Sequence, residues 1–225
     1  MLKLPVAWSD STFLPYDFAH FAVIYDSQQL AKPPTSLAEL VDGPAEQKII
    51  IMDPRTSTPG LGLVRWMKAV YGDKAGEAWA RLKRRVLTVT PGWSEAYGLF
   101  TKGEAPLVFS YITSPAYHQI AEKSDRYRAA VFSEGHPLQV EVAAAIAGSP
   151  EIALARDFLA FMLTPGFQDA IPAGNWMFPA AATSTPLPAE FTSLPEPAST
   201  LPVDPAVVAR ERAAWTAEWL DAMSK

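Results

Sequence analysis

The chain has 225 residues, of which 49% are hydrophobic and 19% are charged, and its formal net charge is −5. This apolar content excludes a disordered chain, and the acidic balance argues against nucleic acid as a partner. The absence of cysteine excludes disulfides, thiolate nucleophiles and cysteine-based zinc sites, and no apolar run approaches the roughly 20 residues that span a bilayer.

Apolar runs alternate with amphipathic segments along the chain. Runs rich in β-branched and aromatic residues predict strands at 20–25, 48–52, 86–90, 107–112, 127–132 and 139–146. Helical periodicity predicts helices at 59–71, 73–85, 149–164 and 204–224. In the third of these helices we expect Ile152, Ala155, Phe158, Leu159 and Met162 to be buried. The alternation of strands and helices indicates an α/β fold.

Proline follows a capping residue where several helices are expected to begin. The pairs are Thr58-Pro59, Ser114-Pro115, Ser149-Pro150, Thr164-Pro165 and Asp204-Pro205. The first two follow apolar strands, so they should lie at the carboxyl ends of strands, where open α/β sheets bind ligands. Helix N-termini at that edge attract anions through their free N–H groups.

Four loops combine these positions with residues that bind polar or aromatic ligands. Residues 53–62 (DPRTSTPGLG) suit an anion or polar-ligand cradle, although an ordinary capped turn is an equally good interpretation. The other three loops contain Trp93, the pair Tyr111 and Tyr117, and Trp176. For each of the two tryptophans, a role in packing remains an alternative interpretation. If the loops converge, they suit a ligand with a cationic aromatic ring and an oxygen-rich tail.

Catalytic and metal-binding patterns are weak. The sequence has no GxSxG or HExxH motif, so we expect no enzyme and no catalytic residues. His118 and Glu122 have metal-ligand spacing, but a pair on a helix surface is the better interpretation. Glu134 and His136 are expected in a solvated turn. No metal or cofactor site is predicted.

Several motifs resemble those of one protein family and occur along this chain in the same order. Six segments of the chain resemble the thiamine-binding proteins of bacterial ABC importers: 53–62, 92–100 (GWSEAYGLF), 110–117 (SYITSPAY), 132–142 (FSEGHPLQVEV), 170–177 (AIPAGNWM) and 213–225. These are two-lobed periplasmic solute-binding proteins. The resemblance implies an α/β, periplasmic-binding-protein-like (type II) architecture. It also implies capture of thiamine, or a thiamine phosphate, between two lobes and delivery to the membrane permease.

The resemblance assigns roles to five residues. It implies that Ser57 hydrogen-bonds the oxygen-rich tail of the ligand and that Trp93 lies beside the thiazolium. Tyr111 and Tyr117 are implied to supply stacking and hydroxyl contacts, and Trp176 to close the aromatic cage.

The resemblance also implies a division into lobes. Family members carry a further segment before the position that matches Met1, so we expect residues 20–128 to form a nearly complete second lobe. Residues 1–19 and 129–225 should form an incomplete first lobe with the hinge strands and the C-terminal helix. The full-length family is periplasmic, whereas no apolar segment of export-signal type follows Lys3.

Three alternatives remain open at this point. The first is a ferric-ion or other small-solute receptor of the same fold, with Tyr111 and Tyr117 as phenolate ligands. The second is an enzyme on the same scaffold, against which the missing cysteine nucleophile counts. The third is a truncated remnant that binds nothing.

Overall fold

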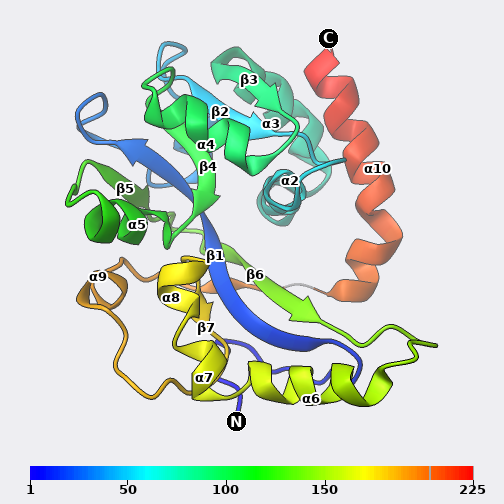
Figure 1. Cartoon of the computed structure of the whole chain (residues 1–225). Coiled ribbons are helices and arrows are strands. Elements are labelled where there is room, and N and C mark those ends of the chain that lie inside the picture. The colour runs from blue at the N-terminus through cyan, green and yellow to red at the C-terminus, as the bar shows by residue number, and fades with distance from the viewer. Residues whose placement is uncertain (203, 225) are drawn as a thin grey trace.

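A computed structural model describes residues 1–202 and 204–224 as a mixed sheet flanked by helices (Figure 1). The strand order is β3-β2-β4-β1-β6-β8, and β5 and β7 also pair with β1. The strands are β1 (Leu14–Asp26), β2 (Ile49–Met52), β3 (Val86–Thr90), β4 (Leu107–Tyr111), β5 (Tyr127–Ala130), β6 (His136–Ala143), β7 (Phe178–Pro179) and β8 (Thr200–Leu201).

The helices cover the sheet and its ends. They are α1 (Leu37–Asp42), α2 (Thr58–Tyr71), α3 (Ala75–Leu82), α4 (Trp93–Thr101), α5 (Ser114–Ala121), α6 (Ile152–Met162), α7 (Pro165–Gln168), α8 (Ile171–Gly174), α9 (Ala189–Thr192) and α10 (Pro205–Ser224). In the described part of the chain, none of them has the length and apolar content needed to cross a membrane.

Strand β1 joins the two halves of the sheet. Its C-terminal half pairs antiparallel with β4 and β5, and its N-terminal half pairs antiparallel with β6 and β7. Figure 1 shows β1 running through the middle of the molecule between these partners. Its central residues are buried on both faces, which explains why the sequence reads as a continuous apolar run without alternation.

The six predicted strands are confirmed, with three differences in length. β5 ends at Ala130, two residues earlier than predicted. β1 begins at Leu14, well before the apolar run, and β6 begins at His136 and ends at Ala143. The start of β1 was not predicted because Pro15, Tyr16 and Asp17 interrupt the apolar pattern, and the start of β6 was not predicted because His136-Pro137 is not typical of a strand. The predicted helix at 73–85 is a shorter α3 flanked by two 3₁₀ turns.

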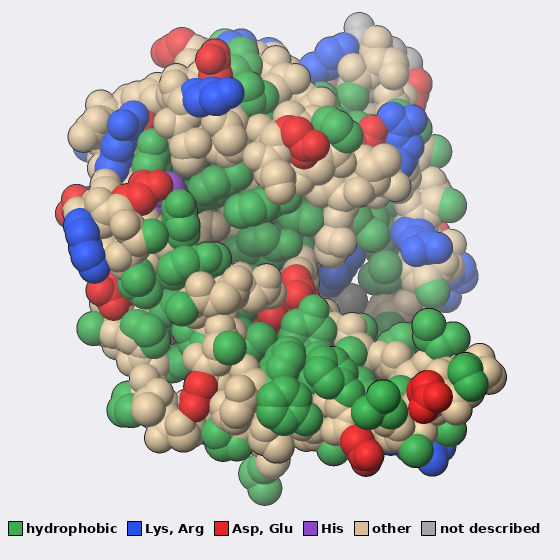
Figure 2. All heavy atoms as spheres, viewed as in Figure 1, with side chains coloured by type: hydrophobic (Ala, Val, Ile, Leu, Met, Phe, Trp, Pro, Cys, Tyr) green, Lys and Arg blue, Asp and Glu red, His purple; other side chains and the backbone are tan. Residues whose placement is uncertain are grey.

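The predicted burial of the helix at 149–164 is wrong for most of its residues. α6 begins at Ile152, and of its residues only Met162 is buried, while Ile152 and Phe158 are exposed. The periodicity of apolar residues indicates that a helix has an apolar face, but it does not indicate whether another element covers that face. Figure 2 shows hydrophobic side chains gathered over the lower part of the molecule, where Figure 1 places α6 and α7.

The main core lies between the sheet and helices α2, α3 and α4. Trp66 and Trp79 are fully buried in it, and Trp219 of α10 meets Trp79 edge-on with ring centroids 6.5 Å apart. His136 is also fully buried, so the predicted solvated turn is wrong at this residue. The Phe132 N–H donates to His136 Nε2 over 2.9 Å, which leaves Nδ1 to donate to the Phe21 carbonyl over 2.7 Å. The imidazole thus links β6 to β1.

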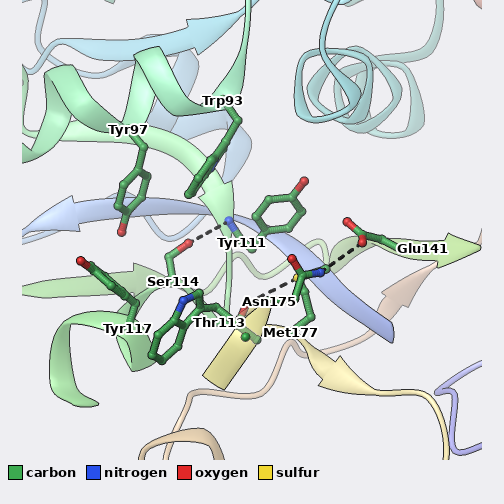
Figure 3. A pocket seen from close by; sticks show the side chains of 11 residues that line it. Trp93, Tyr97, Tyr111, Thr113, Ser114, Tyr117, Glu141, Asn175 and Met177 are labelled. Atoms are coloured by element: carbon green, nitrogen blue, oxygen red, sulfur yellow. Dashed lines mark hydrogen bonds between the residues drawn. The ribbon is translucent and has the colours of Figure 1, made fainter. Parts of the chain in front are cut away.

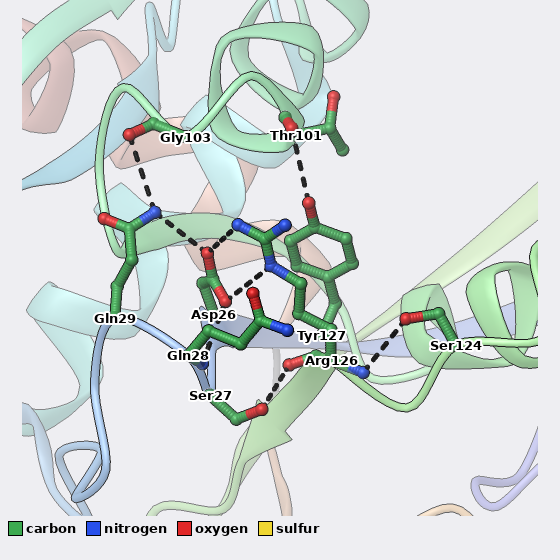
Figure 4. Close-up of polar contacts among 9 residues, drawn as sticks. All are labelled: Asp26, Ser27, Gln28, Gln29, Thr101, Gly103, Ser124, Arg126 and Tyr127. Atoms are coloured by element: carbon green, nitrogen blue, oxygen red, sulfur yellow. Dashed lines mark hydrogen bonds and ion pairs between the residues drawn. The ribbon is translucent and has the colours of Figure 1, made fainter.

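A buried ion pair closes the C-terminal end of β1 (Figure 4). The Asp26 carboxylate is fully buried and accepts from Arg126 Nε at 2.8 Å and Nη2 at 2.6 Å. Gln29 Nε2 and the Gln28 N–H also donate to it, at 2.8 Å and 3.0 Å. These contacts hold the turn after β1 against the segment that leads into β5.

Candidate functional site

A cavity of about 430 Å³ opens where α4, the β4–α5 turn, β6 and α8 meet (Figure 3). It is lined by Trp93, Tyr97, Tyr111, Thr113, Ser114, Tyr117, Glu141, Gly174, Asn175, Trp176 and Met177. The structure therefore brings together four of the five predicted site residues from three separate segments of the chain. This volume suits a small organic molecule.

Five of the eleven lining residues carry aromatic rings. Trp93 stacks on Tyr97 with ring centroids 4.9 Å apart, and Tyr117 meets Trp176 edge-on at 5.1 Å. Trp93 and Tyr117 are 36% and 37% exposed, so a substantial part of each ring is available to a ligand. Such faces attract cations and stack on planar heterocycles.

Trp176 has a strained backbone. Its φ of 58° lies in the left-handed region, which costs a non-glycine residue about 1–3 kcal/mol. Strain of this kind gathers at ligand-binding positions, where the surrounding structure maintains it. In this conformation the indole of Trp176 contacts the ring of Tyr117.

Hydrogen bonds orient the rings on the β4 side. Trp93 Nε1 donates to Ser110 Oγ over 2.7 Å, and Ser110 Oγ shares a 2.8 Å hydrogen bond with Ser114 Oγ. The Tyr111 hydroxyl donates to Gln139 Oε1 over 2.9 Å. Burial raises the pKa of Tyr111 above its ordinary value, so its hydroxyl stays protonated.

Ser57 lies outside the lining of this cavity. Its Oγ accepts from the Gly60 N–H over 3.4 Å, so Ser57, and not Thr58, is the N-cap of α2. The same one-residue shift occurs at α5, where Thr113 is the N-cap and Ser114 is already helical. Arg55 of the predicted cradle is paired with Asp53, with Nη2 and Oδ2 2.5 Å apart. Thr56 Oγ1 donates to the Pro91 carbonyl over 2.7 Å, which places the cradle beside the loop that carries Trp93.

An acidic cluster that was not predicted from the sequence lies at the β6 side of the cavity. Glu141 accepts from the Tyr16 hydroxyl at 2.8 Å, from Asn175 Nδ2 at 3.1 Å and from Gln139 Nε2 at 3.1 Å. Asn175 Nδ2 also donates to Asp17 Oδ2 over 2.7 Å. The only available signal was the spacing of Gln139 and Glu141, two apart on one strand and therefore on one face.

Asp17 is fully buried, and its Oδ1 has no hydrogen-bond partner in the described part of the chain. Burial raises the pKa of Asp17 from 3.8 to about 7, with a further contribution from the charge of Glu141. A buried carboxyl that resists ionisation marks a place where negative charge is uncompensated.

This shift predicts a pH-dependent effect of Asp17→Asn. The pKa of Asp17 is higher in the folded protein, so ionisation between pH 4 and pH 7 destabilises the native state as the pH rises. Asparagine cannot ionise. We therefore expect the free energy of unfolding of the variant minus that of the unmodified chain to be larger by about 1–2 kcal/mol at pH 8 than at pH 5, which means that the variant gains relative stability as the pH rises.

Urea unfolding at the two pH values measures this difference. Burial lowers the pKa of His20 and of His136 in both proteins, so their pH-dependent contributions to stability cancel in the difference. A difference between the two proteins that is the same at both pH values would contradict the assignment.

Among the described residues, no group of three or more His, Asp or Glu side chains is arranged to hold a metal ion. His118 and Glu122 do pair, with Nδ1 and Oε2 2.7 Å apart, but His118 is buried rather than on the helix surface.

Comparisons with known proteins agree with each other. Residues 18–173 match the family model described as "Bacterial extracellular solute-binding protein". The "Thiamine-binding periplasmic protein" of Brucella abortus biovar 1 (strain 9-941) is 59% identical over 224 residues, which are 100% of this chain and 67% of that protein. The protein of the same name from Escherichia coli (strain K12) is 55% identical and is covered over 68% of its length.

Solved structures give the same result. A "Periplasmic thiamin binding protein" superposes with a TM-score of 0.96 at 55% identity, covering 100% of this chain and 70% of that chain. A "Bordetella ferric binding protein" superposes with a TM-score of 0.73 at 16% identity, covering 98% of this chain and 73% of that one. The second likeness concerns the fold alone.

Proposed function

Because the chain belongs to the bacterial extracellular solute-binding proteins, we propose that it captures thiamine, or a thiamine phosphate, in the aromatic cavity and delivers it to the permease of an ABC importer. The family expected from the motifs is confirmed, as is the α/β, periplasmic-binding-protein-like fold. The relatives are periplasmic by name, and we place the action of this protein in the same compartment.

One observation carries the proposal: Trp93, Tyr111, Tyr117 and Trp176 converge on one cavity. Thiamine joins a planar aminopyrimidine to a cationic thiazolium. An aromatic face stabilises a cation by about 0.5–2 kcal/mol per contact, and stacking holds the pyrimidine. The ring pairs Trp93–Tyr97 and Tyr117–Trp176 offer surfaces for both halves of such a ligand.

The lobe division is part of the proposal. Residues 20–128 supply Trp93, Tyr111 and Tyr117, whereas residues 129–225 supply Glu141 and Trp176, so the cavity lies between the two ranges. Ser57 is proposed to meet the hydroxyl or phosphate tail of the ligand from the N-terminus of α2, whose free N–H groups favour an anion.

The geometry favours a receptor for an organic cation over a ferric receptor. A phenolate ligand must lose its proton, but Tyr111 is buried and donates its hydrogen to Gln139. The named relatives are binding proteins, which supports a receptor and not an enzyme.

The test is a calorimetric titration of the chain and of Trp93→Ala with thiamine. We expect saturable binding by the chain and an affinity lower by about 10-fold to 100-fold in the variant, since a stacking and cation–π face is lost. Trp8→Ala is the control, because Trp8 lies in the N-terminal segment outside the cavity lining. Equal thiamine affinity in all three proteins would exclude this cavity as the site, and absence of binding to the unmodified chain would exclude the ligand.

A further inference from the structure

Of the described residues that line the cavity, Glu141 is the only one with a charged side chain. Figure 3 shows it at the end of the cavity opposite Trp93 and Tyr97, beside Asn175. The aromatic contacts in the proposed function do not use it. A carboxylate in an otherwise uncharged wall attracts a ligand group of opposite charge.

The carboxylate of Glu141 is held in place by donors from three directions. The Tyr16 hydroxyl and Asn175 Nδ2 donate to Oε2, and Gln139 Nε2 donates to Oε1. Gln139 is itself held by the Tyr111 hydroxyl, so the aromatic wall and the carboxylate share one network. The position of the charge is therefore set before any ligand arrives, which reduces the entropy lost on binding.

No cation of the described chain neutralises this charge. No lysine or arginine in the part that the structure describes forms an ion pair with Glu141 or Asp17. Asn175 Nδ2 joins Asp17 to Glu141 by donating to both carboxyl groups. The buried Oδ1 of Asp17 has no hydrogen-bond partner among the described residues. Two neighbouring carboxyl groups without a counter-ion favour a positively charged ligand.

We propose that Glu141, supported by Asp17, is the specificity residue that selects ligands for a positive charge. This inference rests on the proposed function: the aromatic faces bind the planar rings of thiamine, and Glu141 distinguishes its cationic thiazolium from a neutral ring of the same shape. The aromatic faces also favour a cation, but the carboxylate adds a full charge at one end of the cavity.

The test uses thiamine and deazathiamine, a neutral isostere with a thiophene in place of the thiazolium. Both are titrated by calorimetry into the unmodified chain, Glu141→Gln and Glu104→Gln. Glutamine keeps the size of the side chain and removes its charge. We expect Glu141→Gln to lower thiamine affinity about 10-fold and deazathiamine affinity less than about 2-fold.

Two further variants make the result decisive. Glu104→Gln changes the net charge equally at an exposed residue outside the cavity lining and should leave both affinities unchanged. Glu141→Asp keeps the charge and should keep the preference for thiamine, and its thermal unfolding shows whether substitution at this position preserves the fold.

Equal losses for thiamine and deazathiamine in Glu141→Gln, or no loss for either, would overturn the specificity role and leave the proposed function standing. Failure of the unmodified chain to bind either compound would overturn the proposed function and, with it, this inference.

Discussion

Gly60→Ala is expected to destabilise the fold by about 3 kcal/mol, at the upper end of what an added methyl group costs in a packed site. Gly60 lies in the first turn of α2, directly against the end of β2. A Cβ there would lie 2.6 Å from the Met52 carbonyl oxygen and 2.7 Å from the carbonyl carbon and oxygen of Asp53. All of these atoms belong to the backbone of the last residue of β2 and of the residue that follows it, so relief requires moving the helix away from the end of the strand.

Chemical unfolding of Gly60→Ala measures this cost, and Gly98→Ala is the matched control. Gly98 is also helical, in α4, but a Cβ there meets no atom within 4 Å. Alanine has the higher helix propensity, so the control should be neutral or stabilised by up to about 1 kcal/mol. Comparable unfolding free energies for the two variants would show that α2 can move away from β2 without cost.

Asp26→Ala is expected to cost about 3 kcal/mol, because it removes the acceptor of the buried network at the end of β1 (Figure 4). Arg126, Gln29 and the Gln28 N–H all lose their partner. The Arg126 side chain is 33% exposed and can reach water, which keeps the cost at the lower end for a broken buried pair.

The acid dependence of unfolding gives a second readout. Hydrogen bonds from Arg126 hold the pKa of Asp26 below its ordinary value of 3.8. A lowered folded-state pKa stabilises the protein above that ordinary value, and the stabilisation is lost as the pH falls through the folded-state pKa. The difference in unfolding free energy between the unmodified chain and Asp26→Ala should therefore shrink below pH 4.

Asp125→Ala provides the comparison for the ion pair. Asp125 pairs with Arg128 at 3.2 Å, but the two side chains are 82% and 52% exposed. Exposed pairs contribute at most about 1 kcal/mol, so this variant should unfold almost as the unmodified chain does. If Asp26→Ala were equally mild, the network at the end of β1 would be dispensable for stability.

The sequence alone determined the fold class and most of the strands, because local composition controls both. The runs at 48–52 and 86–90 coincide with β2 and β3 within one residue. The aromatic residues of the site could also be identified, since Trp93, Tyr111 and Tyr117 occur close to strand ends, where ligands bind in open α/β sheets.

Two features differ from the predictions for the same physical reason. The exposure of Phe158 and the place of Ser57 depend on which elements lie beside them, and neither periodicity nor capping patterns contain that information.

The acidic cluster was decided by tertiary structure alone. Asp17, Glu141 and Asn175 are far apart in the chain, and each is unremarkable in its own segment. The antiparallel pairing of β1 with β6 places Asp17 opposite Glu141, and the turn after α8 brings Asn175 between them. Which side chains meet across paired strands, and whether a lysine or arginine lies beside them, depends on contacts between distant segments, and no local pattern in the sequence contains that information.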